Sequence, residues 1–558
     1  MSLDATTLNI VGKALLAIAR EMAVNLRRAS YSTVVREARD FSVGIIDLEG
    51  NVVAQAEMIP MQTGGISEAF RPIAGRFDLR ALTPDDAFIT NDPFDGGQHL
   101  NDFFLYTPIF VDDAPIGFGA SVAHHVEIGG GMPGLNAEAT ELYQEGIRLP
   151  ASQFSISRDW NRGFVEQFIR ANVRVPDKVL GDMNAQFAAN NTADRRVREL
   201  AEKYGTETVV QVMDGLQDYA ERRIRQGIGQ IPDGVYTGED FVEAAPWGLD
   251  PVRIAARVTV EGTAVHVDFA GTDEQVPANI NCPVASTISS VQAAIRGVLH
   301  ESDIPFNGGC NRPITVDVPY GTILNPRPPA AVRARMNPGS RVYNAVVRAL
   351  SEAVPERVIA TGNDTTTAIA LSHLDRQTGE YGIVIEIVGG GWGAAPTHDG
   401  MDGLDNPMAN CANAPVEALE LEAPYFRVVA YRLRPDSGGP GRQRGGLGIE
   451  RSYEALRDGV IFAAYSDRHD AGPAGLFGGE PGGTGAFNLV LHDGGKKRLP
   501  CVASAVLRRG DVIEVLSGGG GGYGRPAERT GAAAERDVRE RKVSGRARRR
   551  SPDPAIGI

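Results

Sequence analysis

Cysteine is scarce in this sequence and long apolar runs are absent, and both absences narrow the class of protein. The four cysteines include no CxxC pair, which argues against a zinc–thiolate site or a redox dithiol; they are Cys282, Cys310, Cys411 and Cys501. We expect reduced thiols in a cytoplasmic protein. No window reaches the roughly 18 consecutive apolar residues of a membrane span. The N-terminus also lacks the basic lead and the small-residue cleavage site of a secretory signal.

An excess of positive charge is missing as well. The formal net charge is −14, so we expect neither nucleic acid nor an anionic membrane as a partner. No GxxxxGK[ST] motif is present, and no lysine or hydroxyl pattern follows the glycine run 518–522. That run favours an anion-wrapping loop, or a flexible loop that closes over a site or meets a partner. We therefore expect no ATP site in this chain.

Glycine, by contrast, is abundant. The chain has 66 glycines among 558 residues, whereas the usual share is about 7%. Such an excess indicates many turns and close backbone approaches, which favours a loop-rich, strand-containing enzyme over a helical bundle. The length is too great for one simple core and predicts several domains or lobes.

The apolar periodicities predict a large, multi-lobed α+β protein. Hairpins and sheets are expected in the N-terminal third and in the C-terminal half, with a helical segment between them. We divide the chain into an N-terminal region (1–155), a helical segment (156–235), a mixed to β-rich region (236–526) and a flexible basic tail (527–558) that begins as a surface helix.

Two local patterns open the N-terminal region. Apolar residues recur at helical spacing from Leu8 to Leu26, with Thr6 or Thr7 as the expected N-cap. Residues 40–57 then alternate as a hairpin that turns at the dipeptide 50–51. Strand character is expected to continue to about residue 125.

Histidine and carboxylate cluster around the next predicted hairpin. "DFFLYTPIFV" runs into "DDAP" and returns as "IGFGASVAHHV". If the turn centres on Asp113, Asp102 lies opposite His124, and cross-strand Cβ atoms are about 4.5–5.5 Å apart. His99, on the loop that enters the first strand, folds over the same end. A slip of one residue would instead point His125 inward.

His99, Asp102 and His124 form a ligand set that suits Zn²⁺, Mn²⁺ or Fe²⁺. The alternative is that an Asp–His pair only caps a strand end by hydrogen bonding. Gly96 and Gly97 favour a built site, because glycines let a loop bring its backbone close to a ligand. The predicted metal site falls within the region 1–155.

Several long motifs resemble the hydantoinase B/oxoprolinase family. "NDPFDGGQHLND" is followed about twenty residues later by "AHHVEIGG", and the resemblance continues through "IPFNGGCNRPI" and "NAPVEALELEAPYF" to "LSGGGGGYGRP". The family comprises the B-type subunits of ATP-dependent hydantoinases and lactamases, and it is related to 5-oxoprolinase and to the alpha subunits of acetone and acetophenone carboxylases. The resemblance covers nearly the whole chain.

The resemblance implies a divalent metal held by Asp40, His99, Asp102 and His124, of which Asp40 is implied by the family pattern alone. His125, Glu127 and Glu37 are then candidates for an acid or base, or for residues that orient the ligands. One departure is notable. Many relatives have a histidine in "IPVH", whereas this chain reads "IPMQ" with Gln62.

The resemblance also implies a function. An A-type partner subunit would use ATP to phosphorylate a cyclic amide, and this chain would complete hydrolysis of the ring within a hetero-oligomer. Three alternatives stay open at this point: a B-type subunit of an ATP-dependent ketone carboxylase, a metal-free scaffold subunit, and a metallohydrolase that works alone.

Overall fold

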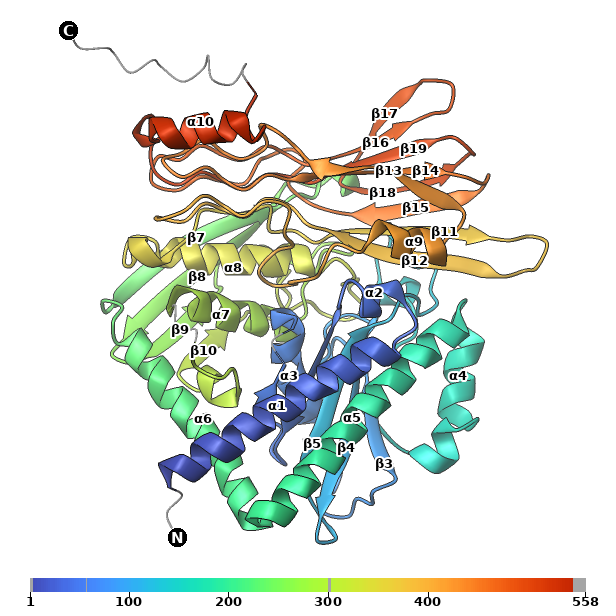
Figure 1. Cartoon of the computed structure of the whole chain (residues 1–558), viewed down its shortest axis with the longest axis vertical. Helices are drawn as coiled ribbons and strands as arrows, with labels where there is room; N and C mark the ends of the chain where they lie inside the picture. Colours follow the sequence, from blue (N-terminus) through green and yellow to red (C-terminus); the bar gives the residue numbers. More distant parts are fainter. Residues whose placement is uncertain (1–3, 57, 300–302, 545–558) are drawn as a thin grey trace.

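The computed structural model describes residues 4–56, 58–299 and 303–544, and it has the mixed helix-and-sheet architecture predicted from the sequence (Figure 1). Within these ranges, four sheets are connected by helices, with a helical segment between the N-terminal sheet and the later ones. The main cluster of buried apolar side chains draws on residues from Val11 to Val502, so distant parts of the chain share one core. The four-part division of the chain stays a prediction.

A six-stranded antiparallel sheet in the order β2-β1-β5-β4-β3-β6 organises the N-terminal region. Its strands are β1 (Phe41–Ile46), β2 (Val52–Gln55), β3 (Asp86–Thr90), β4 (Asp102–Val111), β5 (Ala114–His124) and β6 (Ser152–Ser155). The helices α1 (Ala5–Ala29) and α5 (Pro176–Tyr204) cover one face, and α3 (Pro60–Arg76) packs on the other. Because both faces are covered, every residue of β4 is buried.

Helices dominate the segment after this sheet, as predicted. They are α4 (Phe164–Asn172), α5 and α6 (Thr206–Ile228), and α5 and α6 flank α1 (Figure 1). The short α2 (Thr33–Arg36) lies between α1 and β1. Single turns of 3-10 or π-helix connect other elements; these are Leu142–Gln144, Ile156–Trp160, Ala245–Trp247, Gly308–Asn311, Pro355–Arg357 and Pro526–Glu528.

A second sheet in the order β10-β9-β8-β7 carries two helices on one side. Its strands are β7 (Gly234–Val242), β8 (Val252–Glu261), β9 (Ala264–Asp268) and β10 (Ile314–Asp317). The helix α8 (Met336–Leu350) packs on β7 and β8, and α7 (Val284–Leu299) lies between α8 and α3. These helices therefore join the second sheet to the N-terminal half of the molecule.

Two further sheets form a sandwich in the last third of the chain. One has the order β12-β11-β15-β18 and the other β13-β14-β19-β16-β17, and their inner faces enclose a separate apolar cluster. The strands are β11 (Thr367–Leu374), β12 (Tyr381–Val388), β13 (Phe426–Leu433), β14 (Ile449–Ala455), β15 (Val460–Tyr465), β16 (Ala486–Val490), β17 (Lys496–Leu499), β18 (Val502–Leu507) and β19 (Val512–Leu516). The helices are α9 (Val416–Glu422) and α10 (Gly531–Arg539).

The glycine run 518–522 is buried among extended segments, and does not form the anion-wrapping or flexible loop that was expected. We call the segments 389–394, 437–446, 474–483 and 518–524 the glycine bundle. Its backbone N–H groups follow a three-residue period: Gly519 and Gly522 donate to residues 483 and 480, while Gly520 and Tyr523 donate to residues 446 and 443. A period of three without internal hydrogen bonds is typical of polyproline II geometry. A Cβ on Gly520 would lie 1.9 Å from the Trp392 carbonyl oxygen.

Three local expectations need correction or limits. The N-cap of α1 is Asp4, whose carboxylate accepts from the backbone N–H of Thr6 and Thr7, so neither threonine is the cap. Strand character does not continue to residue 125, because α3 interrupts it. In the tail, α10 is the expected surface helix, but residues 545–558 lie outside the described residues, so the flexibility of the tail stays a prediction.

Candidate metal centre

The β4–β5 hairpin has the register predicted from the sequence, with Asp102 directly opposite His124. It turns on Asp112 and Asp113, both at positive φ, as a two-residue hairpin turn requires. The centre of the turn thus falls between residues 112 and 113, half a residue before the predicted centre at Asp113. A bulge on β5, where Ile109 pairs with Gly117 but Phe110 pairs with Pro115, adds one residue and restores the predicted pairing.

The loop before β4 delivers His99 to the same end of the hairpin. Gly96 has a φ of +86°, and a Cβ there would lie 2.2 Å from the Glu68 carbonyl oxygen. Only glycine fits this bend. The backbone N–H of Gly97 closes the turn on the Asp92 carbonyl at 2.8 Å. The imidazole of His99 is then fixed by Nδ1, which lies 3.1 Å from the Arg333 carbonyl oxygen.

Four predicted ligands meet at this point. His99 Nε2 lies 3.1 Å from His124 Nδ1 and 3.2 Å from Asp102 Oδ1, and the last two atoms are 3.6 Å apart. These three residues form a buried group able to hold a metal ion. Asp40 stands beside them, with Oδ2 3.6 Å from His124 Nδ1. It is positioned by the pairing of β1 with β5, where the His124 backbone N–H donates to the Asp40 carbonyl.

Burial and neighbouring charges set the protonation of the group. Burial, reinforced by the cation of Arg335, lowers the pKa of His99 to about 3, so its ring is neutral at pH 7. Burial alone would raise the pKa of Asp102, but His99 and Arg335 outweigh it and hold this pKa well below its usual range. Burial, with repulsion from Asp102, raises the pKa of Asp40 to about 6.

Two polar side chains complete the site. The Arg335 guanidinium donates to Asp102 Oδ2 at 2.5 Å, and both side chains are almost fully buried. The Gln62 amide donates to Asp40 at 2.8 Å and to Asp102 at 3.4 Å. Sequence reasoning marked Gln62 only as a departure from relatives, and it missed Arg335 altogether. The one signal was an arginine pair in the apolar text "AAVRARM", 233 residues away from Asp102 in the chain.

The three acid or base candidates lie away from the group. His125 Nε2 lies 3.1 Å from Gln186 Oε1, behind the sheet. Burial lowers the pKa of His125 to about 4. Glu127 is held by the Arg174 guanidinium at 2.7 Å and by two backbone N–H groups. Glu37 pairs with Arg36 and is partly exposed. None of the three lines the cavity at the group.

That cavity is small. Its volume is about 20 Å³, enough for one ion or water, since a water needs roughly 10–15 Å³ of such space. Asp40, Gln62, His99, His124 and Arg335 line one side. The other lining residues are Ile59, Leu135, Arg333, Met336, Thr366, Ala368, Ile385, Ile387, Ala409, Cys411 and Tyr465. The sandwich strands β11, β12 and β15 thus close the site over the N-terminal hairpin.

All four cysteines lie within the described residues, and each is buried and unbonded. No helix of the described ranges is long and apolar enough to cross a membrane.

Comparison with known proteins agrees with the resemblance in the motifs. The family model for hydantoinase B/oxoprolinase matches residues 4–526. The B-type subunit of a putative D-/L-hydantoinase from a Pseudomonas species is 34% identical, covering 94% of this chain and 91% of that protein. The crystal structure of an ATP-dependent caprolactamase from Pseudomonas jessenii has a TM-score of 0.89 at 28% identity, covering 98% of this chain and 95% of that one.

A nucleotide-free acetone carboxylase structure is also similar, with a TM-score of 0.87 over 98% of this chain and 79% of that one. At 18% identity that likeness shows a shared fold alone. The match to the family model spans both the hairpin that carries His99, Asp102 and His124 and the glycine run, so it includes every motif discussed above. This chain belongs to the hydantoinase B/oxoprolinase family.

Proposed function

We propose that this chain is the metal-dependent B-type subunit of an ATP-dependent cyclic amidase, which completes hydrolysis of a lactam or hydantoin-like ring that an A-type partner has activated by phosphorylation. The names of its relatives, a hydantoinase B-type subunit and a caprolactamase, support this reaction class. The observation that carries the proposal is the buried cluster of His99, Asp102 and His124.

The donor atoms of this cluster fit a divalent metal such as Mn²⁺, Zn²⁺ or Fe²⁺. Ligand bonds of about 2.0–2.2 Å in a tetrahedral site place neighbouring donors about 3.3–3.6 Å apart. Two of the observed separations, both 3.6 Å, lie in that range, and the other two, 3.1 and 3.2 Å, are slightly shorter. The Arg333 carbonyl can only accept a hydrogen bond, so the neutral His99 ring carries its proton on Nδ1 and presents the Nε2 lone pair to the cluster.

Asp40, His99, Asp102 and His124 would hold the metal. A divalent ion there would polarise a substrate carbonyl and lower the pKa of a coordinated water toward neutrality. Arg335 keeps Asp102 ionised, because a carboxylate paired with a guanidinium resists protonation. Gln62 fixes the orientation of Asp40 through its amide N–H. Apolar side chains of the sandwich strands, such as Ile385 and Ile387, line the other side of the cavity.

The Tyr465 hydroxyl is a further polar group of this cavity. It makes no hydrogen bond to the described residues, although the ring is almost fully buried. Burial raises the pKa of Tyr465 to about 12, so the hydroxyl keeps its proton at pH 7. A protonated hydroxyl in a cavity lined by metal-ligand candidates is able to donate to an oxygen of the substrate.

The ATP site and the partner belong to the same proposal. We place ATP in the A-type subunit, because neither the sequence motifs nor the buried glycine bundle supplies a phosphate-binding loop here. A reducing cytoplasmic setting suits four buried, unbonded cysteines.

Metal analysis of the purified full chain, alongside His99→Ala and Asp102→Ala, tests the proposal. We expect about one equivalent of metal in the wild type and its loss in both variants. The chain reconstituted with its A-type partner should release phosphate and ring-opened product when given ATP and a lactam.

Other outcomes identify the competing functions. Wild-type protein without metal that still supports turnover would mean a scaffold subunit. Phosphate release stimulated by a ketone and bicarbonate, and not by a lactam, would mean a carboxylase. Turnover without ATP or partner would mean a metallohydrolase that works alone.

A further inference from the structure

The segment 331–335, which reads "AVRAR" and directly precedes α8, contacts the candidate metal centre twice, and we call it the arginine strap. The backbone carbonyl oxygen of Arg333 lies 3.1 Å from His99 Nδ1. The guanidinium of Arg335 donates to Asp102 Oδ2 at 2.5 Å. One short segment therefore touches two of the four proposed ligands, and its position decides whether both contacts form together.

Glu145 holds the strap from outside the metal centre. Its carboxylate accepts from the backbone N–H of Val332 at 3.0 Å and from that of Arg333 at 2.8 Å. Glu145 is 4% exposed, and a buried carboxylate is costly unless its oxygens are satisfied. Hydrogen bonds to a charged acceptor are roughly twice as strong as those between neutral groups. The two bonds therefore fix the backbone at the residue whose carbonyl meets His99.

Other contacts hold different parts of the strap. The Arg333 guanidinium donates to the side-chain oxygen of Asn101 and, at 2.9 Å, to the Gly134 carbonyl. The Ala334 backbone N–H donates to the Asn279 carbonyl at 2.8 Å. Among the described residues, only Glu145 accepts from the backbone N–H groups of residues 332 and 333. Its carboxylate is therefore the contact that sets where the Arg333 carbonyl lies.

The position of this carbonyl matters because His99 has a second possible hydrogen bond. His99 Nε2 lies 3.2 Å from Asp102 Oδ1, so a proton on Nε2 would donate to that carboxylate and cover the lone pair that a metal needs. With the Arg333 carbonyl in place, the proton belongs on Nδ1, because an unprotonated Nδ1 would face the lone pairs of the carbonyl oxygen. The strap thus keeps Nε2 free for the cluster.

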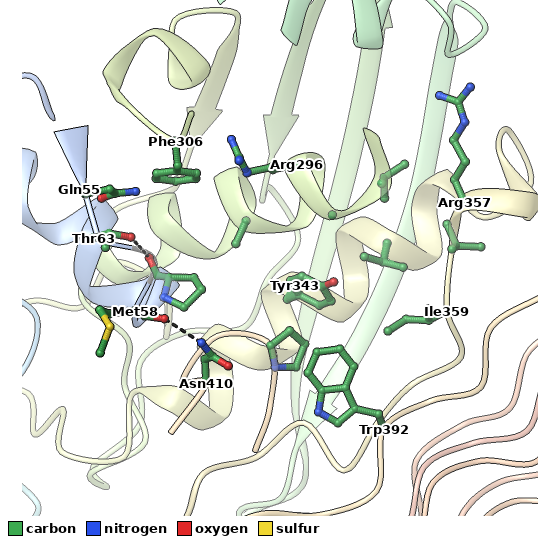
Figure 2. Close-up of a pocket in the computed structure, with 17 residues that line it drawn as sticks. Gln55, Met58, Thr63, Arg296, Phe306, Tyr343, Arg357, Ile359, Trp392 and Asn410 are labelled. Atoms are coloured by element: carbon green, nitrogen blue, oxygen red, sulfur yellow. Dashed lines mark hydrogen bonds between the residues drawn. The ribbon is translucent and has the colours of Figure 1, made fainter. Parts of the chain in front are cut away.

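A different wall of the metal cavity is held without the strap. Backbone of the segments 58–63 and 407–411 separates this cavity from a pocket of about 730 Å³. Figure 2 shows the Asn410 side chain donating to the Met58 carbonyl, at 3.0 Å, where the two segments meet. Neither residue bonds to His99 or to the strap, so this contact offers a control for the effect of loosening the cavity wall in general.

We propose that Glu145 is a positioning residue for the metal centre, which fixes the Arg333 carbonyl and, through it, the tautomer and orientation of His99. The proposal rests on the proposed function, because a cluster that binds a metal needs His99 Nε2 without its proton. Glu145 itself neither bonds to a proposed ligand nor lines the cavity.

The tautomer of His99 in the metal-free full chain tests this role. Long-range ¹H–¹⁵N NMR of protein labelled at its nine histidines distinguishes the two tautomers, and His99→Ala identifies the signals. Wild-type protein should carry the proton on Nδ1. Glu145→Leu should move the population toward the Nε2–H form, because a displaced carbonyl leaves the Asp102 carboxylate as the better acceptor.

The matched control is Asn410→Gly. It removes the side chain that clamps the other wall, and glycine adopts the φ of +50° at this position without strain. We expect the tautomer of His99 in this variant to be the same as in the wild type. A tautomer shift of equal size in Asn410→Gly would overturn the proposal, because any loosening of the cavity would then have the same effect.

Metal affinity, measured by titration against a competing chelator, gives a second readout. Removing a group that orients a metal ligand typically weakens metal binding roughly 10- to 100-fold, and we expect a loss of about that size in Glu145→Leu. Glu145→Gln keeps one oxygen that can accept from the strap. It should therefore show a smaller loss of affinity and a smaller tautomer shift, and it carries the test if Glu145→Leu does not fold.

A purely structural role for Glu145 predicts another pattern. Stability in urea would fall in both variants while the His99 tautomer and the metal affinity stayed as in the wild type, and that result would overturn the proposal. Wild-type protein that binds no metal would contradict the proposed function instead. The tautomer, which is read without metal, would then still decide whether Glu145 positions His99.

Discussion

The candidate metal centre and the glycine run 518–522 are both buried, yet they are built from different kinds of residue. The metal centre depends on charged side chains whose burial is offset by specific partners, such as Arg335 for Asp102. The glycine bundle is rich in glycine and satisfies backbone groups between neighbouring segments, as between Gly520 and Gly446. We therefore expect the stability of the first region to depend mainly on its matched charges. We expect the stability of the second to depend on the space that glycine leaves for close backbone contact.

Gly520→Val should have the largest effect. Its Cβ would lie 1.9 Å from the Trp392 carbonyl oxygen, and because the nearest atoms belong to the backbone, only a backbone shift could relieve the clash. We expect a loss of more than about 4 kcal/mol in unfolding free energy, seen as insoluble or unfolded protein by circular dichroism. The control is Gly531→Ala, where nothing lies within 4 Å of the new Cβ. Normal folding of Gly520→Val would contradict the inference that this region depends on close backbone packing.

Arg335→Met should have the next largest effect, because it leaves the Asp102 carboxylate buried without its cation. Removing one partner of a buried pair costs about 3–5 kcal/mol. Urea denaturation in the presence of a chelator measures this loss. The double variant Arg335→Met/Asp102→Asn, which removes both charges, should recover much of the stability that Arg335→Met loses. If the double variant instead lost as much stability as the two single substitutions added together, the charge argument would be contradicted.

Glu386 tests whether buried charge matters outside the metal centre. Burial raises the pKa of Glu386 to about 7, with Arg451 and Tyr453 opposing the shift. In the unfolded chain this carboxyl ionises near its ordinary pKa of 4.5, so the free energy of unfolding should fall as the pH rises from about 4.5 to about 7 and level off above that. The total fall attributable to this group is about 2–4 kcal/mol.

Glu386→Gln should flatten this part of the pH profile, as measured by urea denaturation between pH 4.5 and 8. The variant also removes the carboxyl group that contacts Arg451, which shifts the overall stability, so the slope of the profile is the readout. An unchanged slope would show that the buried carboxyl does not titrate in this window.

Arg76→Gln should have the smallest effect, and it sharpens the comparison because the pair has the same chemistry as Arg335 and Asp102. Arg76 donates to both oxygens of Asp95 at 2.5 and 2.7 Å, but half of its side chain is exposed. Solvent and salt screen such a pair. We expect a change in denaturation midpoint close to the measurement error, and a large loss would mean that exposure does not set the value of these ion pairs.

The sequence predicted the hairpin register because a recognisable turn, "DDAP", separates two strand-forming runs, and because His99, Asp102 and His124 lie within 26 residues of one another. The prediction succeeded through two offsetting details. The turn lies on Asp112 and Asp113, and the bulge near Ile116 makes up the difference. Arg335 could not be predicted in this way, because no local periodicity links it to a carboxylate 233 residues earlier.

The helix α3 and the glycine run show where local preference gives way to packing. Gly64, Gly65 and Pro72 disfavour a helix, and their presence hid α3. A Cβ on Gly64 would lie 2.2 Å from Ser289 Oγ on α7, so the glycine serves helix contact and not chain flexibility. The run 518–522 has the composition of a flexible loop, and only its neighbours in space make it rigid.

The bulge on β5 has a consequence for how this hairpin can change over generations. Side chains on a strand alternate between two faces, so parity decides which histidine of the pair 124–125 meets Asp102. An insertion or deletion of one residue between Phe110 and Gly117 would turn His124 to the opposite face and disassemble the ligand set from seven or more residues away. The register therefore predicts that changes of two residues in this turn keep His124 opposite Asp102, whereas changes of one residue do not.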